Sequence, residues 1–226
     1  MTLDPKEVLK QIFGYEKFRE GQNEIITSIV KKKNVLAIMP TGAGKSLCYQ
    51  IPAIINDKKT IVISPLVALM DDQVSALKIN KVSAERLHSH MTDNENKEIW
   101  DSFCKGNIKI LYMSPEALMS QSKVNTIKTL DVGLFVIDAA HCISKWGAGF
   151  RKDYEALSQL KEIFPDANIS AFTATADKAS REDIMEKLTN NNCKLFLQGF
   201  RRPNLSLSAY QKFNWKDQLL KFLYNR

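Results

Sequence analysis

The chain contains a series of short apolar runs that are separated by amphipathic segments. The runs lie at residues 35–39, 60–64, 108–113, 134–138 and 169–173, with a weaker one at 85–87. They are rich in aliphatic and β-branched residues, which predicts strands, and the run at 35–39 reads as a strand buried on both faces.

The segments between these runs carry apolar residues at helical spacing. Helices are predicted at residues 66–77, 92–105, 154–164 and 177–188, and a short helix is predicted at 115–119. Strands that alternate with helices are typical of right-handed βαβ units. We therefore expect an α/β fold with a mostly parallel sheet, helices on both faces, and ligands at the carboxyl ends of the strands.

The two ends of the chain depart from this alternation. Residues 3–33 are predicted to be helical, with Asp4-Pro5 as an N-cap and first helical position and with Gly14 as an interruption. Residues 199–204, Gly-Phe-Arg-Arg-Pro-Asn, indicate a boundary. A predicted strand at 205–210 and a helix at 215–224 then resemble the start of another βα unit. We expect one domain at residues 1–204, and a linker with the beginning of a second domain at 205–226.

The composition is that of an ordinary globular protein, with 44% hydrophobic and 25% charged residues in a chain of 226. No apolar stretch approaches the ~20 residues of a membrane span, and the N-terminus lacks the features of a signal peptide. Four separated cysteines without a C-x-x-C pair fit reduced thiols, so we expect an intracellular protein. The net charge of +7 permits a polyanionic partner without establishing one.

The first apolar run leads into Pro-Thr-Gly-Ala-Gly-Lys-Ser at residues 40–46, and a predicted helix follows. In a strand–loop–helix unit of this kind, Gly42 and Gly44 would let backbone N–H groups converge on phosphate oxygens. Lys45 would neutralise phosphate charge, and the Ser46 hydroxyl would bind Mg²⁺. The full G-x-x-x-x-G-K-[ST] pattern fails at its first glycine, which is Met39, and the remainder is a variant found in helicases. The alternative is a glycine turn followed by an incidental lysine.

A second group of candidate residues lies at the ends of the later strands. Asp138 ends a buried run and could hold Mg²⁺ through a water, which is the second requirement of a phosphate-loop NTPase. The next residue is Ala139, where many such enzymes carry a glutamate that orients and deprotonates the attacking water. His141 follows, and Thr173 and Thr175 offer hydroxyl groups near it.

Residues 13–22, Phe-Gly-Tyr-Glu-Lys-Phe-Arg-Glu-Gly-Gln, allow two interpretations. Tyr15 and Arg19 could sandwich an adenine while Gln22 hydrogen-bonds to its edge. Alternatively, this is a surface helix pair packed by its aromatic residues, and the segment by itself favours that role.

Taken together and in order, these motifs resemble the RecQ family of DNA helicases. The similarity extends from about residue 13 to residue 205 and rests on residues 13–22, the loop at 40–46, Ser64-Pro65-Leu66, Asp138-x-x-His141-Cys142-Ile143-Ser144, Trp146-Gly147, Phe150-Arg151 and Phe172-Thr173-Ala174-Thr175-Ala176. The resemblance implies a superfamily 2 motor of two RecA-like domains, with ATP between them and single-stranded DNA across the top. It identifies this chain as the first RecA-like domain with a little of the second. The arginine finger of the second domain is expected to lie outside it.

The same resemblance implies a role for each matching residue. ATP would be bound by Tyr15, Phe18, Arg19, Gln22, Thr41, Gly42, Ala43, Gly44, Lys45 and Ser46, which reverses the preference for a packing role at residues 13–22. Mg²⁺ would be held by Ser46 and Asp138, and Lys45, Asp138 and His141 would form the catalytic group. His141, Thr173 and Thr175 would couple the nucleotide state to DNA.

The DNA contacts would come from the loop after His141. In this loop Trp146 and Phe150 would stack on bases and Arg151 would bind phosphate, although without the resemblance the two aromatic residues are better explained as core or turn residues. The implied function is 3′–5′ DNA unwinding coupled to ATP hydrolysis, by a monomer that binds single-stranded or partly duplex DNA. The resemblance also implies a place in the cytoplasm and nucleoid, or in the nucleus.

Two positions depart from the family pattern. Ala139 stands at the position of the family's glutamate, and Ala148-Gly149 stands where the family has a His-Asp pair. Both changes remove functional side chains and leave the predicted fold intact, which suits either knockout substitutions or a lineage that has lost its ATPase activity. We therefore expect ATP binding, negligible ATP hydrolysis, and no unwinding by this chain alone.

Functions of other classes remain as alternatives. A pseudo-ATPase could use ATP, or no nucleotide, to clamp DNA or a partner. A small phosphate-loop kinase is disfavoured by the adenine-type motif upstream of the loop and by Asp138-x-x-His141 with Thr-Ala-Thr. His88-Ser89-His90 would place two imidazoles on one face of a strand, but the lack of a third ligand nearby disfavours a metal site.

Overall fold

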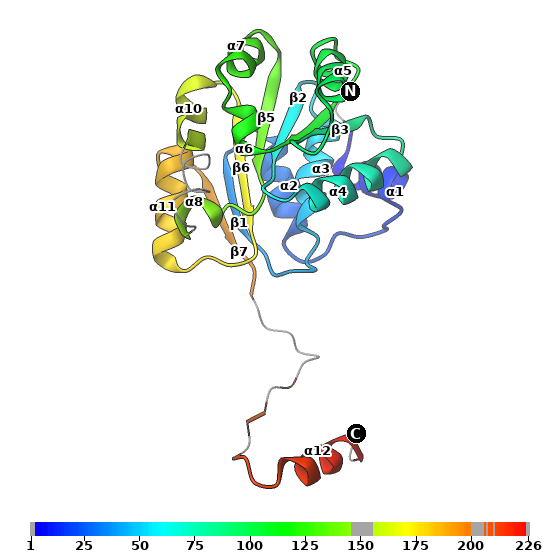
Figure 1. Ribbon diagram of the computed structural model, residues 1–226, viewed down its shortest axis with the longest axis vertical. Helices are drawn as coiled ribbons and strands as arrows, with labels where there is room; N and C mark the ends of the chain where they lie inside the picture. The colour runs from blue at the N-terminus through cyan, green and yellow to red at the C-terminus, as the bar shows by residue number, and fades with distance from the viewer. Residues whose placement is uncertain (1–2, 146–155, 200–205, 207, 210, 225–226) are drawn as a thin grey trace.

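The computed structural model describes residues 3–145, 156–199, 206, 208–209 and 211–224. Within these residues the chain forms a seven-stranded parallel sheet with the strand order β3-β4-β2-β5-β6-β1-β7 (Figure 1). The strands are β1 (Val35–Ile38), β2 (Lys59–Ile63), β3 (Ala84–Leu87), β4 (Ile110–Met113), β5 (Val132–Ile137), β6 (Asn168–Thr173) and β7 (Lys194–Leu197). The predicted α/β fold with a parallel sheet is confirmed.

Helices cover both faces of this sheet, as predicted. One face packs against α1 (Pro5–Phe13), α2 (Gln22–Val30), α3 (Lys45–Ile55) and α4 (Val67–Ile79). The other packs against α5 (Asp93–Cys104), α6 (Pro115–Leu118), α7 (Gln121–Thr129), α8 (Cys142–Lys145), the 3₁₀ turn η1 (Leu157–Gln159), α10 (Leu160–Ile163) and α11 (Lys178–Thr189).

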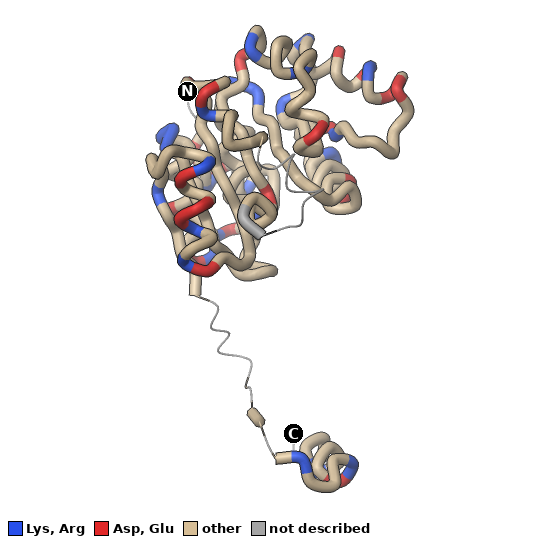
Figure 2. Tube along the Cα trace, turned by 60° about the vertical axis from the view of Figure 1, so that its left-hand side comes forward, with Lys and Arg blue, Asp and Glu red and all other residues tan. Residues whose placement is uncertain are grey.

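The apolar runs are continuous because each of the strands β1 to β6 contributes to both cores. In β1, Val35 and Ala37 join the cluster under α1–α4, whereas Leu36 and Ile38 join the cluster on the opposite face. Successive side chains of a strand point to opposite faces, so a sheet covered on both sides needs apolar residues at every position. The charged residues lie outside this core: Figure 2 shows charges of both signs interspersed along the outer helices.

Local signals at the helix ends act as expected. The Asp4 side chain accepts a hydrogen bond from the Lys6 N–H (3.2 Å), and Gly14 ends α1 in the left-handed conformation (φ 73°). Asp177 caps α11 by accepting from the Ser180 N–H (2.8 Å). These caps satisfy backbone groups that have no partner inside the helix.

Some elements differ from the sequence expectations. Helix α7 and strand β7 were not predicted; β7 is a short edge strand with exposed Leu195 and Leu197. The predicted strand at 205–210 lies mostly outside the described residues, and residues 206, 208 and 209 belong to no strand. The helix predicted at 215–224 is present as α12 (Trp215–Tyr224); its side chains are exposed, and Figure 1 shows it apart from the sheet.

The strand order decides which loops meet at the carboxyl edge. Strand β6 lies between β5 and β1, and β7 pairs with the other side of β1. The residues that follow β5, β6, β1 and β7 are therefore neighbours, although they are far apart in the sequence.

Candidate functional site

The loop between β1 and α3 is built around two glycines in the left-handed region. Gly42 has φ 85° and Gly44 has φ 81°, conformations that other residues adopt only with strain. The Ala43 N–H donates to the Pro40 carbonyl (3.1 Å), which closes the turn. Gly44 is the N-cap of α3, and the first N–H groups of a helix have no partners within it, so this helix end has the geometry that suits an anion.

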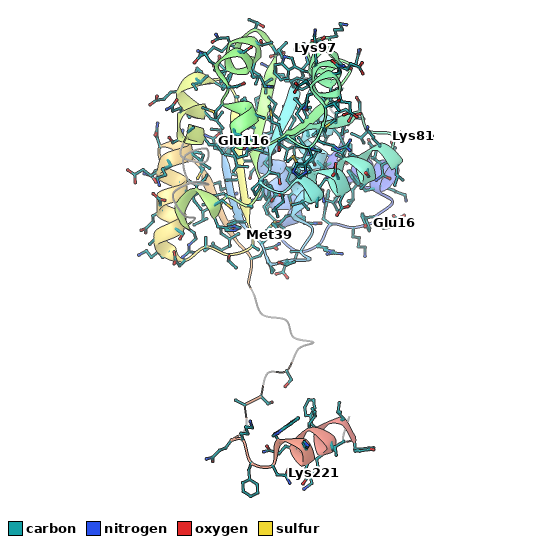
Figure 3. The ribbon with its side chains drawn as sticks, in the orientation of Figure 1. Glu16, Met39, Lys81, Lys97, Glu116 and Lys221 are labelled. Atoms are coloured by element: carbon teal, nitrogen blue, oxygen red, sulfur yellow. The ribbon has the colours of Figure 1, made fainter. Side chains whose placement is uncertain are left out.

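Met39, at the position of the missing glycine, is a core residue. Its side chain is fully buried (0% exposed) at the carboxyl edge of the sheet (Figure 3). Its N–H donates to the Thr173 carbonyl (3.0 Å), and its carbonyl accepts from the Lys45 ammonium (3.3 Å). The loop thus uses this position for packing, and Gly42 and Gly44 provide the turn.

Lys45 and Asp138 form a pair of partly desolvated charges at this edge. Burial lowers the pKa of Lys45, and the Asp138 charge opposes that effect. Burial raises the pKa of Asp138, opposed by the Ala139 N–H (2.9 Å from Oδ1) and by Lys45 and His141. The ionised form of Asp138 is therefore incompletely stabilised by the protein. Together with the Ser46 hydroxyl in the first turn of α3, the Asp138 carboxylate would provide oxygen ligands of the kind that Mg²⁺ prefers.

Ala139 adopts the left-handed conformation with φ 55°. In this conformation the Ala139 N–H donates to the Asp138 carboxylate. The N–H of the next residue, Ala140, donates to the Phe172 carbonyl (2.9 Å) on β6. The Ala139 side chain is a methyl group that packs against the core cluster. Position 139 therefore offers no group that could accept a proton.

Thr173 links His141 to the phosphate loop. The Thr173 hydroxyl donates to the Thr175 carbonyl (3.1 Å) and accepts from the Thr175 N–H (3.3 Å). His141 Nδ1 lies 2.8 Å from the same oxygen, in a hydrogen bond whose direction is set by the imidazole tautomer. The Thr173 carbonyl also binds the Met39 N–H, so three of the predicted site residues, His141, Thr173 and Thr175, are brought together beside the loop.

Gln22 clamps the loop from the opposite side, a contact that the sequence reasoning missed. Its Oε1 accepts from the Arg19 N–H (2.8 Å), and its Nε2 donates to the carbonyls of Ala43 (3.2 Å) and Gly44 (3.1 Å). The Arg19 guanidinium donates to the Gly42 carbonyl. A Cβ at position 44 would overlap the Gln22 amide nitrogen, which is a second reason for glycine there.

A pocket of about 310 Å³ opens beside this clamp. Its lining includes Tyr15, Arg19, Gln22, Ser46, Gln50 and Gln73. Tyr15 is 53% exposed and available to a ligand, whereas Gln22 is 1% exposed and its amide is engaged with the loop. Phe18, by contrast, packs against the apolar cluster under α1–α4 and does not line this pocket.

The remaining predicted residues fall into two groups. Trp146, Phe150 and Arg151, with the Ala148-Gly149 pair, lie outside the described residues. His88 and His90 have ring centroids 5.8 Å apart, and across the described ranges no group of three or more His, Cys, Asp or Glu residues could hold a metal ion.

No helix among the described residues is long and apolar enough to cross a membrane.

Comparison with known proteins adds a family match. The family model described as "DEAD/DEAH box helicase" matches residues 19–184. The chain is 44% identical over 96% of its length to the ATP-dependent DNA helicase RecQ of Haemophilus influenzae, covering 35% of that protein. It is 40% identical over 89% of its length to the probable ATP-dependent DNA helicase RecS of Bacillus subtilis, covering 40% of that protein. The chain thus spans little more than a third of these relatives' length, and the predicted resemblance to RecQ helicases is confirmed.

Solved structures share the fold at lower sequence identity. A hypothetical ATP-dependent RNA helicase from Sulfolobus tokodaii matches with a TM-score of 0.66 and 21% identity over 86% of this chain and 56% of that one. The DUF1998 helicase MrfA bound to DNA matches with a TM-score of 0.71 and 19% identity, over 87% of this chain and 29% of that one. The RecA-like fold expected for a helicase domain is confirmed.

Proposed function

Because the chain belongs to the DEAD/DEAH box helicase family, we propose that it is the ATP-binding and single-stranded-DNA-contacting half of a RecQ-like 3′–5′ DNA helicase. The observation that carries this proposal is the meeting of three strand ends, which brings Lys45 after β1, Asp138 after β5 and Thr173 at the end of β6 to one edge. We assign residues 1–204 to the first RecA-like domain, and 205–226 to the linker and the start of the second.

The nucleotide would lie between the loop and the pocket beside Tyr15. The loop N–H groups and the Lys45 ammonium would bind the phosphates, and charge-assisted bonds of this kind are the strong ones. The adenine would stack on the exposed Tyr15 ring, with Arg19 beside it. Gln22 would keep the loop carbonyls turned away from the phosphates, and the free lone pair of its Oε1 could accept from the base edge. Ser46 and Asp138 would hold Mg²⁺, which neutralises phosphate charge when bound.

Hydrolysis is proposed to be impaired in this chain. A water that attacks the γ-phosphate needs a group that orients it and takes its proton, and Ala139 presents only a methyl group. General-base assistance is typically worth ~10²–10⁴-fold in rate. The same observation supports the second candidate function, a pseudo-ATPase module that binds ATP and clamps DNA without turnover.

Coupling to DNA would pass through the His141–Thr173 hydrogen bond. His141 ends the segment that leads into α8 and the residues beyond it, where Trp146, Phe150 and Arg151 are proposed to contact single-stranded or partly duplex DNA. The proposed partners are therefore ATP and DNA, and the proposed active form is a monomer acting inside the cell.

The decisive experiment is calorimetric titration of the chain with ATP and Mg²⁺, compared with Lys45→Ala. Loss of one charge-assisted contact of roughly 1.5–3 kcal/mol should weaken ATP binding more than tenfold. Lys97→Ala, which removes an exposed lysine on α5 (Figure 3), is the matched control and should bind like the unmodified chain. If Lys45→Ala and the unmodified chain have equal affinity, the loop does not bind the nucleotide and the proposal fails.

A further inference from the structure

Gln198 ties the strand that leaves the domain to the nucleotide pocket. It follows β7 directly, and its backbone N–H donates to the Ile38 carbonyl at the end of β1 (2.9 Å). Its side-chain amide crosses to a different part of the chain and donates to the Glu20 carbonyl. The half-buried Gln198 therefore contacts the turn at residues 20–21, which is distant in sequence but adjacent to the pocket.

That turn is shaped to receive the Gln198 side chain. Gly21 has φ 75°, and a Cβ at this position would overlap the Gln198 amide nitrogen. Gly21 is also the N-cap of α2, whose first residue is Gln22. The turn thus sets where α2 begins, and with it the position of Arg19 and of the Gln22 Oε1 that accepts from the Arg19 N–H.

We propose that Gln198 is a positioning residue that fixes the turn at residues 20–21 and thereby makes the nucleotide site selective for adenine over guanine. The inference rests on the proposed function, because it places the base in the pocket lined by Tyr15, Arg19 and Gln22. Base recognition depends on hydrogen-bonding groups held within about 0.5 Å of their productive positions. Phosphate binding depends on Lys45 and on the loop, and the two bonds of Gln22 Nε2 to the Ala43 and Gly44 carbonyls keep that loop in place when the Gln198 contact is lost.

The Gln198 side chain contributes little to the fold apart from its hydrogen bond to the Glu20 carbonyl. Strand β7 is held by its own ladder to β1, in the register Val35↔Lys194 to Ile38↔Leu197, and the backbone bond of Gln198 continues that ladder. Truncation of the side chain leaves these bonds intact. We therefore expect a change in base selectivity with little change in melting temperature.

The test is a comparison of ATP and GTP dissociation constants, measured by calorimetry with Mg²⁺. Gln198→Ala should weaken ATP binding roughly two- to tenfold, the range expected for one neutral hydrogen bond, and should leave GTP binding within about twofold. Gln198→Glu has the same shape but cannot donate to the Glu20 carbonyl when ionised, so its selectivity should fall at least as far. Gln121→Ala, on the far helix α7, is the matched control and should keep the original ratio.

A second variant reaches the same contact from the other side. Gly21→Ala should displace the Gln198 side chain and lower the ATP:GTP affinity ratio, and adding Gln198→Ala should lower the ratio no further. An unchanged ATP:GTP affinity ratio in Gln198→Ala would overturn this inference and leave the proposed function standing. The same holds if the unmodified chain shows no preference for ATP over GTP. Parallel losses of ATP affinity, GTP affinity and melting temperature would assign Gln198 a purely structural role and would also overturn it. Failure of the unmodified chain to bind either nucleotide would overturn the proposed function as well.

Discussion

Replacing Gln22 by glutamate tests the clamp on the phosphate loop most directly. The two side chains have the same shape, but an ionised glutamate places oxygen where the Gln22 Nε2 now donates to the Ala43 and Gly44 carbonyls at 3.2 and 3.1 Å. Two hydrogen bonds are lost, and a carboxylate oxygen faces two carbonyl oxygens. The loop should then lose the arrangement in which its N–H groups converge on phosphate.

The expected magnitude follows from those two contacts. Neutral hydrogen bonds contribute roughly 0.5–1.5 kcal/mol each, so the clamp is worth about 1–3 kcal/mol of loop order. If that order has to be restored when nucleotide binds, the ATP dissociation constant should rise about 5- to 150-fold. Gln22→Ala removes these two bonds and the bond from the Arg19 N–H, but it adds no repulsion at the loop carbonyls, so its loss of affinity should be smaller.

The assay is calorimetric titration with ATP and Mg²⁺ at several pH values. Burial against carbonyl oxygens raises the pKa of the introduced carboxyl group, and its protonated form can donate again. ATP affinity of Gln22→Glu should therefore recover as the pH falls, whereas that of Gln22→Ala should not. The clamp argument is refuted if Gln22→Glu binds ATP within twofold of the unmodified chain at neutral pH.

Two further predictions concern the acidic side of the site. Ala139→Glu should bind ATP and Mg²⁺ no more tightly than the unmodified chain, because a carboxylate would be added beside the γ-phosphate; tighter binding by Ala139→Glu would contradict this. Steady turnover by the unmodified chain that Lys45→Ala abolishes would contradict the proposed loss of hydrolysis. Asp138→Asn should raise the free energy of unfolding at neutral pH by on the order of 1 kcal/mol, or about 2–4 °C in melting temperature, and remove the Mg²⁺-dependent part of ATP affinity. Burial raises the Asp138 pKa, so ionised Asp138 destabilises the fold at neutral pH, and the difference should vanish as the pH falls through that pKa. Coincident melting curves at neutral pH would refute it.

Local pattern was enough to predict most of the fold. The strands β1, β2, β4, β5 and β6 were recognisable because a sheet covered on both faces demands continuous apolar runs. The caps at Asp4 and Asp177 and the turn at Gly14 were recognisable because each acts on neighbouring backbone groups. Strand β7 escaped prediction because it is a four-residue edge strand whose apolar run, residues 195–197, is only three residues long and largely exposed.

Residue identity also led to a predicted set of site residues, through motifs whose spacing reflects their chemistry, and the structure brings His141, Thr173 and Thr175 of that set together. The order of the strands in the sheet was not readable from that spacing. The sheet order places β6 between β5 and β1, and this alone brings Thr173 within hydrogen-bond distance of both His141 and Met39. The use of Met39 as a core residue could likewise be judged only once the packing around it was known.

The contacts of Gln22 with residues 43–44, and of Gln198 with Glu20, join segments 21 or more residues apart and were decided by tertiary structure. Periodicity and capping describe the interaction of a residue with its own helix, strand or turn. Contacts between such elements depend on how whole faces pack, which is a property of the assembled sheet and its helices. The sequence therefore determined the elements and the chemistry that they carry, while the packing of those elements determined which of these residues act together.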